Sequence, residues 1–362
     1  MHSTVISSAW IHHQADKFFF MLSLVLYKII NMNIKYEDLK KLFYDKLVKY
    51  GASAELAEES ATLFADNTLD GVYSHGINRF PRVLSYIKDG YIDLDAKPEL
   101  VESFGAIERW DGKMGMGNTN AKFLMNRAME LAREHGIGAV AVKNTNHWMR
   151  GGSYGWQAAD NGMIAICWTN TNAIMPPWGG KTPKIGNNPF VIAIPRENGE
   201  HVVVDTAMSQ FAYGKLQTLR LQGKELPVDG GYDENGNITR DPGKIEKTRR
   251  ILPMGFWKGS SLAIALDLVA ALASGGNSTK EIAAKPAEIA VSQVFIAIDN
   301  ERMNAKEFSE QLIDETLAFV ESSEPIDGPV RYPGKGSLDY RRRQSENGIE
   351  VSDEIYQTIL AF

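Results

Sequence analysis

The chain has 362 residues, of which 44% are hydrophobic and 23% charged, a balance typical of folded globular proteins rather than disordered chains. Its formal net charge of −6 argues against a nucleic-acid partner, which would require a basic surface. Because Cys167 is the only cysteine, an intramolecular disulfide and a thiolate metal cluster are excluded, and a reducing cytoplasm is the expected compartment.

A hydrophobic run near the N-terminus, residues 18–30, is shorter than the roughly 20 residues needed to cross a bilayer. It resembles the apolar core of a signal peptide, but few basic residues precede it and no small-residue cleavage site follows. We therefore expect no membrane partner. We interpret residues 1–31 as an extension outside the fold, with the functional chain beginning at Met32.

Helices are expected first along the chain, because apolar residues recur at three- and four-residue spacing from 36 to 67, with Gly51 separating two helices. A turn-like segment at 70–81 precedes a short helix that ends near Lys88, and 120–135 predicts a longer amphipathic helix. Short continuous apolar runs are typical of strands covered on both faces. Such runs occur at 137–142, 163–168, 191–194, 202–204 and 291–298.

The second half of the chain adds a long connection and three further helices. Residues 229–253 are rich in Gly, Asp, Asn and Arg, which predicts a long exposed loop. Residues 262–273 are apolar almost all round, which predicts a buried helix, and further helices are expected at 307–320 and 353–362. The order of elements predicts an α/β protein whose mixed sheet is accompanied by helical N-terminal and C-terminal regions.

The segment Ser74-His75-Gly76, followed by Arg79, carries the strongest chemical indication. Reduction of a ketone needs a proton donor for the developing alkoxide, and histidine serves near neutral pH. The planar guanidinium of Arg79 matches the carboxylate of a keto acid, and both side chains would share a face if the segment were helical beyond Gly76. On spacing alone, a turn histidine beside a solvated arginine explains the same residues.

Three further segments are candidate binding loops. Residues 146–152, which include His147, follow a predicted strand, where ligands bind in open α/β sheets. Residues 170–189 combine amide side chains with Pro–Gly turns, and 257–261 form a helix start suited to an anion. Ordinary turns and a serine cap explain these segments equally well. No G-x-G-x-x-G lies between a strand and a helix, and no metal-spaced cluster occurs, so neither a Rossmann site nor a bound metal is expected.

Five stretches together resemble the family of malate/L-lactate/ureidoglycolate dehydrogenases that lack a Rossmann domain, and the resemblance extends from about Met32 to the C-terminus. They lie at 71–81, 146–159, 175–179, 226–231 and 250–260. The resemblance implies a non-Rossmann nicotinamide-binding α/β domain at 116–306, a helical domain made of 32–115 and 307–362, and a homodimer with sites near its interface. It also implies that His75 is the proton donor.

The resemblance further implies that the cofactor is held by a strand, a helix start and a late loop. These are His201, Val202, Val203, Val204, Asp205, Thr206 and Ala207; Trp257 and Lys258; and Gly334, Lys335 and Gly336. Gly336 stands where the family pattern has an acidic residue, so only backbone contacts are expected there. Asn187 replaces a threonine and keeps a polar side chain, and two extra residues lengthen the turn at 196–200.

Within the family, the resemblance points to the branch that acts on diketo sugar acids. It implies hydride transfer from NADH, with NADPH as the alternative, to the C2 ketone of 2,3-diketo-L-gulonate, giving 3-dehydro-L-gulonate. We expect Arg79 to bind the substrate carboxylate, Ser74 and His147 to line the carbonyl pocket, and Asp205 to orient a histidine or the nicotinamide amide. A malate, L-lactate or ureidoglycolate dehydrogenase, and a non-catalytic sugar-acid binding protein, are the alternatives.

Overall fold

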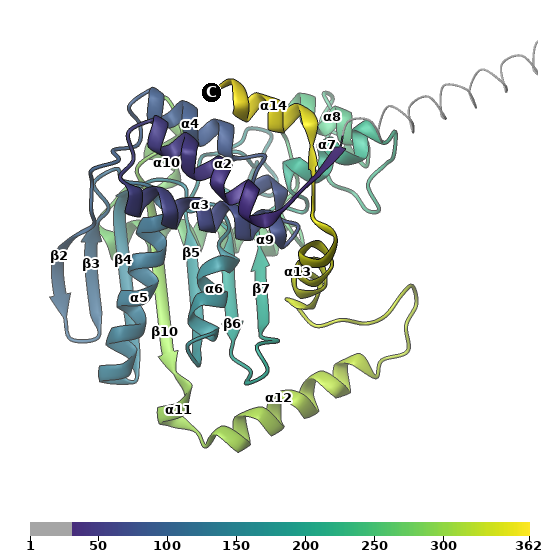
Figure 1. Ribbon diagram of the computed structural model, residues 1–362. Coiled ribbons are helices and arrows are strands. Elements are labelled where there is room, and N and C mark those ends of the chain that lie inside the picture. Colours follow the sequence, from purple (N-terminus) through teal and green to yellow (C-terminus); the bar gives the residue numbers. More distant parts are fainter. Residues whose placement is uncertain (1–30) are drawn as a thin grey trace, which may run out of the picture.

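A seven-stranded mixed sheet forms the centre of the computed structural model, which describes residues 31–362 (Figure 1). The run at 18–30 and nearly all of the expected extension lie outside these residues. The strand order is β2-β3-β4-β10-β5-β6-β7, with β3 and β4 parallel and the other neighbours antiparallel, which confirms the expected class. The strands are β2 (Glu99–Phe104), β3 (Ile107–Asp111), β4 (Ile137–Thr145), β5 (Met163–Thr169), β6 (Phe190–Ile194), β7 (Val202–Thr206) and β10 (Val291–Asp299).

Two helices, α5 (Gly117–His135) and α6 (Gly152–Ala159), cover the sheet face that points toward the viewer in Figure 1. The apolar stripe of α5 packs on the strands, and Leu124 and Phe295 are fully buried in this core. Gly138 permits the close approach, since a Cβ there would lie 2.1 Å from the backbone oxygen of Ala128. Cys167 is buried in the same core, as expected of a small apolar strand residue.

The opposite face is covered chiefly by α9 (Trp257–Ser274), and here one prediction is wrong. Ala263, Leu266 and Ala270 pack against the sheet, whereas Leu268 and Leu272 are 51% and 76% exposed. The helix is apolar on both sides but has only one sheet to pack on, so composition did not distinguish the two sides. It is the one described helix long and apolar enough to cross a membrane, a weak indication because core helices pass the same test.

Beside α9 lies a compact subassembly in the segment expected to be an exposed loop. Ile245 and Ile251 are fully buried there. The prediction is wrong because the Gly and Asp residues of 229–253 make tight turns between short elements instead of an open loop. The short elements of this segment are β8 (Gly231–Tyr232), β9 (Ile238–Thr239) and α8 (Pro242–Thr248). Helix α7 (Tyr213–Leu221) precedes them, and α10 (Thr279–Ala283) follows further along the chain.

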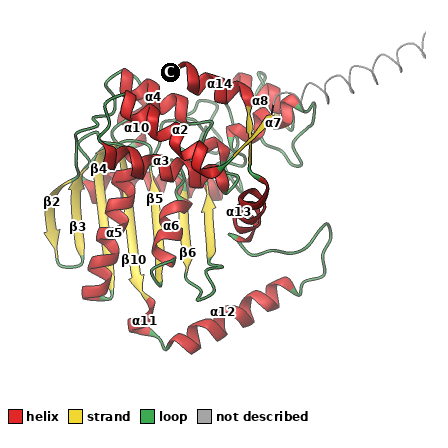
Figure 2. Cartoon of the chain, in the orientation of Figure 1, coloured by secondary structure: helices red, strands yellow, loops and turns green. Residues whose placement is uncertain are grey.

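A helical layer caps one end of the sheet, as Figure 2 shows. Phe43, Phe64 and Phe80 form its centre, with ring centroids 4.5–5.8 Å apart. Lys46 Nζ donates to the backbone oxygen of Leu360 at 2.7 Å, so the C-terminal helix returns to this layer. Its elements are β1 (Asn31–Ile34), α2 (Tyr36–Lys49), α3 (Ala54–Leu69), α4 (Phe80–Lys88), β11 (Ile349–Ser352) and α14 (Asp353–Ala361).

Two parts of the expected helical domain lie elsewhere in the structure. Strands β2 and β3, at 99–111, belong to the sheet, and Trp110 packs against Phe123 of α5 at 5.2 Å between ring centroids. After α11 (Asn300–Met303), helix α12 (Lys306–Glu321) runs along the end of the sheet opposite the helical layer (Figure 1). Helix α13 (Lys335–Asn347) then leads back to the layer. The sheet therefore begins before residue 115.

Candidate active site

The turn that carries His75 follows directly on the end of α3. A single 3-10 turn, η1 (Tyr73–His75), ends there, so the helix does not continue through Gly76 to place His75 and Arg79 on one face. Asn67 Nδ2 donates to the backbone oxygen of His75 at 3.1 Å. A Cβ on Gly76 would lie 2.3 Å from Thr68 Oγ1, so glycine is required for this close turn.

The structure brings His75 and His147 together, although 72 residues separate them in the chain. Their rings stack with centroids 5.6 Å apart and planes at 20°. Ser74 Oγ and His75 Nδ1 are hydrogen-bonded at 3.0 Å. The backbone N–H of Met149 donates to His147 Nδ1 at 2.9 Å, which leaves Nε2 to carry the proton of the neutral ring. The two imidazole rings, each held at Nδ1, thus lie side by side.

The electrostatic surroundings disfavour protonation of both histidines. Burial, together with the charges of Arg79 and Arg150, lowers the pKa of His75 to about 4. Burial, Arg79 and His75 lower the pKa of His147 well below its usual value. Burial also lowers the pKa of Arg79, although a guanidinium remains charged near neutral pH. An anionic ligand would offset the positive charge of the buried arginines, so the site favours anions.

Asp205 lies beside the loop that carries His147 rather than against a histidine. Its Oδ2 accepts from the backbone N–H of Gly152 at 2.8 Å and lies 3.9 Å from Arg150 Nε. A Cβ on Gly152 would lie 2.7 Å from this oxygen, so glycine permits the contact. Burial raises the pKa of Asp205, and Arg150 opposes the shift. Among the described residues, Asp205 therefore orients the loop after β4 and not an imidazole.

A buried ion cluster connects three segments of the site, and sequence reasoning assigned it no role. Arg150 Nη1 contacts Asp70 Oδ2, and Arg150 Nη2 donates to Ser337 Oγ at 3.1 Å. Arg341 of α13 donates to Asp70 through Nε at 2.6 Å and through Nη2 at 3.2 Å. The cluster ties the His75 turn and the His147 loop to the start of α13. Its partners lie 80 and 271 residues apart, so no local pattern indicates them.

Two of the three expected cofactor segments meet along β7. The backbone N–H of Val203 donates to Pro333 O at 3.0 Å. Gly334 has φ +102°, and a Cβ there would lie 2.9 Å from His201 O. Only glycine fits this close backbone approach. At the far end of β7, Thr206 Oγ1 donates to Met254 Sδ at 3.9 Å, which places the start of α9 beside Ala207.

These segments fit a nicotinamide dinucleotide. Trp257 is 57% exposed at the start of α9, and the neighbouring Lys258 is exposed, so they offer an aromatic face and a cation. A Cβ on Gly336 would meet no atom within 4 Å, so the backbone of the first turn of α13 is open to a ligand. Trp156 Nε1, beside Gly334, is a buried donor without an acceptor in the described structure.

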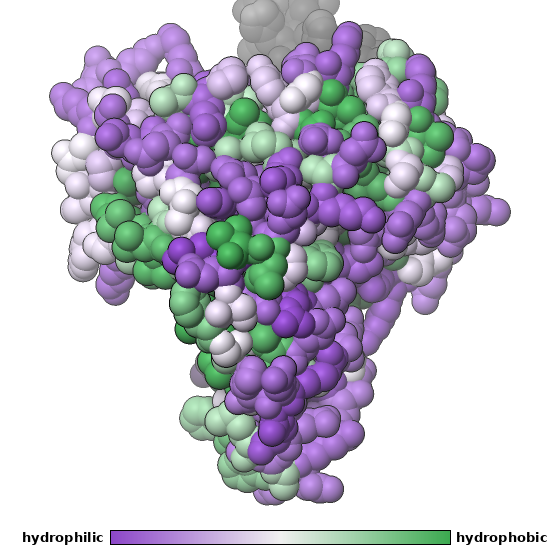
Figure 3. All heavy atoms as spheres, turned by 90° about the vertical axis from the view of Figure 1, so that its left-hand side faces the viewer, coloured by the Kyte–Doolittle hydropathy of each residue, from purple (hydrophilic) through white to green (hydrophobic). Residues whose placement is uncertain are grey.

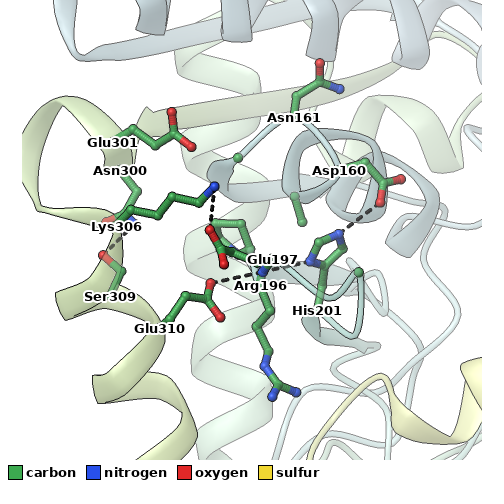
Figure 4. A pocket seen from close by; sticks show the side chains of 14 residues that line it. Asp160, Asn161, Arg196, Glu197, His201, Asn300, Glu301, Lys306, Ser309 and Glu310 are labelled. Atoms are coloured by element: carbon green, nitrogen blue, oxygen red, sulfur yellow. Dashed lines mark hydrogen bonds and ion pairs between the residues drawn. The ribbon is translucent and has the colours of Figure 1, made fainter.

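The His201 side chain is already occupied within the protein. Its Nδ1 accepts from the backbone N–H of Arg196 at 2.9 Å, and Nε2 lies 2.9 Å from Asp160 Oδ1. Figure 4 shows the ring in a polar pocket of about 340 Å³, between the end of α6, the β6–β7 hairpin and α12. Lys335 Nζ is likewise paired with Glu321 at 2.8 Å. At both positions only the backbone remains for a cofactor.

Comparison with known proteins agrees with this geometry. The model of a family described as malate/L-lactate dehydrogenase matches residues 34–360. Proteins named 2,3-diketo-L-gulonate reductase from Citrobacter koseri and Klebsiella pneumoniae are each 48% identical over 333 residues, covering 91% of this chain and all of the relative.

Solved structures give the same result. The sulfolactate dehydrogenase of Methanocaldococcus jannaschii superposes with a TM-score of 0.81 at 32% identity, covering 91% of this chain and 95% of its own. A delta1-piperideine-2-carboxylate reductase from Pseudomonas syringae gives 0.80 at 28% identity, covering 91% and 99%. The resemblance found in the sequence is confirmed, and the chain is an oxidoreductase that belongs to the malate/L-lactate dehydrogenase family.

Proposed function

We propose that this enzyme reduces the C2 ketone of 2,3-diketo-L-gulonate to 3-dehydro-L-gulonate with NADH. The observation that supports this most directly is the stacked pair His75 and His147 in the field of Arg79. Two neutral donors beside a buried cation suit a substrate that carries both a carbonyl and a carboxylate. The names of the relatives at 48% identity support the choice of a diketo sugar acid.

His75 is the proposed proton donor to the oxygen of the reduced ketone. Because Ser74 Oγ bonds to Nδ1, Nε2 is the nitrogen that faces the substrate in this proposal. With a pKa of about 4 in the free enzyme, the ring is neutral near pH 7. A bound substrate carboxylate at Arg79 adds a negative charge, which raises the pKa of His75 and improves its proton supply when it is needed. Ser74 and His147 line the carbonyl pocket.

The cofactor segments are proposed to act mainly through their backbone. His201, Val202, Val203, Val204, Asp205, Thr206 and Ala207 border one side, Trp257 and Lys258 one end, and Gly334, Lys335 and Gly336 the other. The reduced nicotinamide supplies the hydride when bound. NADPH is the alternative, because no acidic residue of these segments is assigned to the ribose 2′-hydroxyl.

Substitution of His75 tests the proposal. We expect His75→Ala to lower kcat by about a hundredfold or more, as for removal of one general acid, while NADH still quenches tryptophan fluorescence with the wild-type Kd. Turnover close to wild type would remove His75 from the mechanism. The wild-type enzyme should be assayed with 2,3-diketogulonate, pyruvate and oxaloacetate, each with NADH and NADPH, and with ureidoglycolate, which is oxidised and therefore needs NAD+ or NADP+. Preference for oxaloacetate, pyruvate or ureidoglycolate would favour a malate, L-lactate or ureidoglycolate dehydrogenase, respectively. Absence of turnover with every substrate would favour a non-catalytic sugar-acid binding protein.

A homodimer in the cytoplasm is proposed as the state of the enzyme. The outward side of α9 is apolar. The C-terminal end of α9 lies next to β3, where Arg109 Nε donates to the backbone oxygen of Ala273 at 2.9 Å. Figure 3 views the molecule from the β2 side and shows hydrophobic side chains in the middle of the surface seen from there. A second copy of the chain would cover the apolar outward side of α9. We define the α9 face by its exposed residues, Leu262, Ile264, Leu268, Val269 and Leu272.

A further inference from the structure

A glutamate outside every segment discussed so far lies beside His147. Glu288 lies between α10 and β10, where Asn277 Nδ2 donates to the backbone oxygen of Ala290 at 2.9 Å and holds the segment. Its side chain is 19% exposed, and Oε1 lies 3.7 Å from His147 Nε2. Nε2 is the nitrogen that carries the proton of neutral His147, since Nδ1 accepts from Met149. Glu288 is therefore placed to hold the ring from its donor side.

Glu288 also acts on Arg79. Burial lowers the pKa of Arg79, and the negative charge of Glu288 opposes this shift. Within residues 31–362, however, no salt bridge joins Arg79 to any carboxylate, and the recorded ionic contact of Glu288 is with His147. The other carboxylates near the site, Asp70 and Asp205, lie against Arg150 instead. Arg79 is thus balanced from a distance and keeps its guanidinium available.

We propose that Glu288 is a positioning residue that holds His147 and sets the affinity of Arg79 for the substrate carboxylate. This inference rests on the proposed function, because it takes Arg79 as the carboxylate site. A substrate anion that reaches Arg79 meets the like charge of Glu288, which weakens binding and favours release of the anionic product. The same carboxylate lies 3.7 Å from His147 Nε2, too far for a hydrogen bond, and its negative charge attracts the Nε2–H and favours the orientation in which that ring stacks on His75. Glu288 thereby weakens binding of the substrate while it orients His147.

The two roles separate when charge and shape are removed independently. Glu288→Gln keeps an acceptor of similar size and removes the charge, so KM for the keto acid should fall about three- to tenfold while kcat changes much less. Glu288→Ala removes both, so KM should fall similarly while kcat falls about tenfold through loss of His147 orientation. Glu324→Gln, an exposed site on the chain, makes the same change in net charge and should alter neither constant.

Three controls distinguish this role from a structural one. The KM difference between wild type and Glu288→Gln should shrink at 0.5 M salt, and it should vanish for the methyl ester of the keto acid. Oxamate, a non-reacting keto-acid analogue, should bind Glu288→Gln more tightly than wild type by calorimetry, whether or not turnover occurs. Equal oxamate binding in the two proteins, or a KM that rises, overturns the inference. Absence of turnover with tighter oxamate binding would instead contradict the proposed function alone.

Discussion

His75 illustrates how one residue links the site to stability. Its pKa is about 4 in the folded chain and near 6.5 when unfolded, so the unfolded chain binds the extra proton between these values. The neutral form of His75 makes its full contribution to the free energy of unfolding above pH 6.5, and this contribution is lost as the pH falls toward 4. The loss between pH 7 and 5 is roughly 1–2 kcal/mol for this partly buried ring.

We therefore expect His75→Gln to flatten the acid side of the stability curve. Urea unfolding followed by circular dichroism at pH 7 and pH 5 measures the change, and the variant should lose less free energy of unfolding than wild type. His135→Gln, on the exposed end of α5, is the control and should follow wild type. Parallel curves for all three proteins would show that His75 titrates alike in both states.

Residues could be found from the sequence where the chemistry is local. Ser74, His75 and Arg79 lie within six positions of each other, so residue types made a proton donor and an anion site one of two readings, and the family resemblance favoured it. Glu288 and Asp70 gave no such signal, because their partners are far away in the chain. A lone acidic residue in a turn is typical of any surface until the fold places it against a cation.

At the scale of elements, α13 connects the proposed cofactor loop at 334–336 to the turn of His75. Arg341 and Arg150 both contact Asp70, whose side chain is only 4% exposed. Gln344 Nε2 donates to the backbone oxygen of Leu69 at 3.0 Å, and Tyr73 OH donates to Gln344 Oε1 at 3.2 Å. These contacts fix α13 to the turn that ends α3.

Asp70→Ala should be among the most damaging single substitutions in the chain. It leaves the buried Arg150 guanidinium with only the more distant carboxylate of Asp205, 3.9 Å from Nε, and breaking such a buried pair costs about 3–5 kcal/mol. Arg342→Gln, on the same helix, breaks only an exposed pair with Glu200 and should cost far less. Urea unfolding measures both, and NADH binding should weaken in Asp70→Ala alone. Equal stability of the two variants would contradict a role for the cluster.

Elements with an apolar period could be predicted, and those without one could not. The stripes of α3 and α5 match helical spacing and pack as expected. Helix α13 carries the run Arg341–Arg343 and almost no apolar stripe, and it is held by ion pairs rather than by a core. Strand β2 is exposed along its whole length and owes its form to pairing with β3. Both depend on partners that a local pattern does not reveal.

For the whole molecule, the fold class could be predicted more readily than the boundaries of its domains. Alternating strands and helices indicated an α/β body, but which strands join the sheet depends on pairings such as that of β3 with β4, across α5. Likewise, α12 has a helical pattern and no buried residue, so its pattern did not say which layer it joins. The α9 face poses the same question, because no element among residues 31–362 covers it.

Charged substitutions on the α9 face should convert the proposed homodimer to monomers. In Leu268→Asp/Leu272→Lys, two side chains that are 51% and 76% exposed in one chain would place charges at the centre of the interface. A stable interface buries about 800 Å² per partner and excludes such charges. Light scattering after size exclusion should give twice the chain mass for wild type and the single mass for the variant. Val48→Lys, an exposed apolar position on α2, should stay dimeric.

The same variant separates assembly from chemistry. Trp257 and Lys258 open the helix whose outer side would be the interface, so a partner copy would lie next to the proposed cofactor segments. Loss of that copy should weaken NADH binding, measured by fluorescence titration. Trp257 is 57% exposed in the isolated chain, and in a monomer no partner chain would cover it. Folding of each chain should persist, since the sheet side of α9 is unchanged. A monomer that binds NADH as tightly as wild type would place the cofactor site away from the interface.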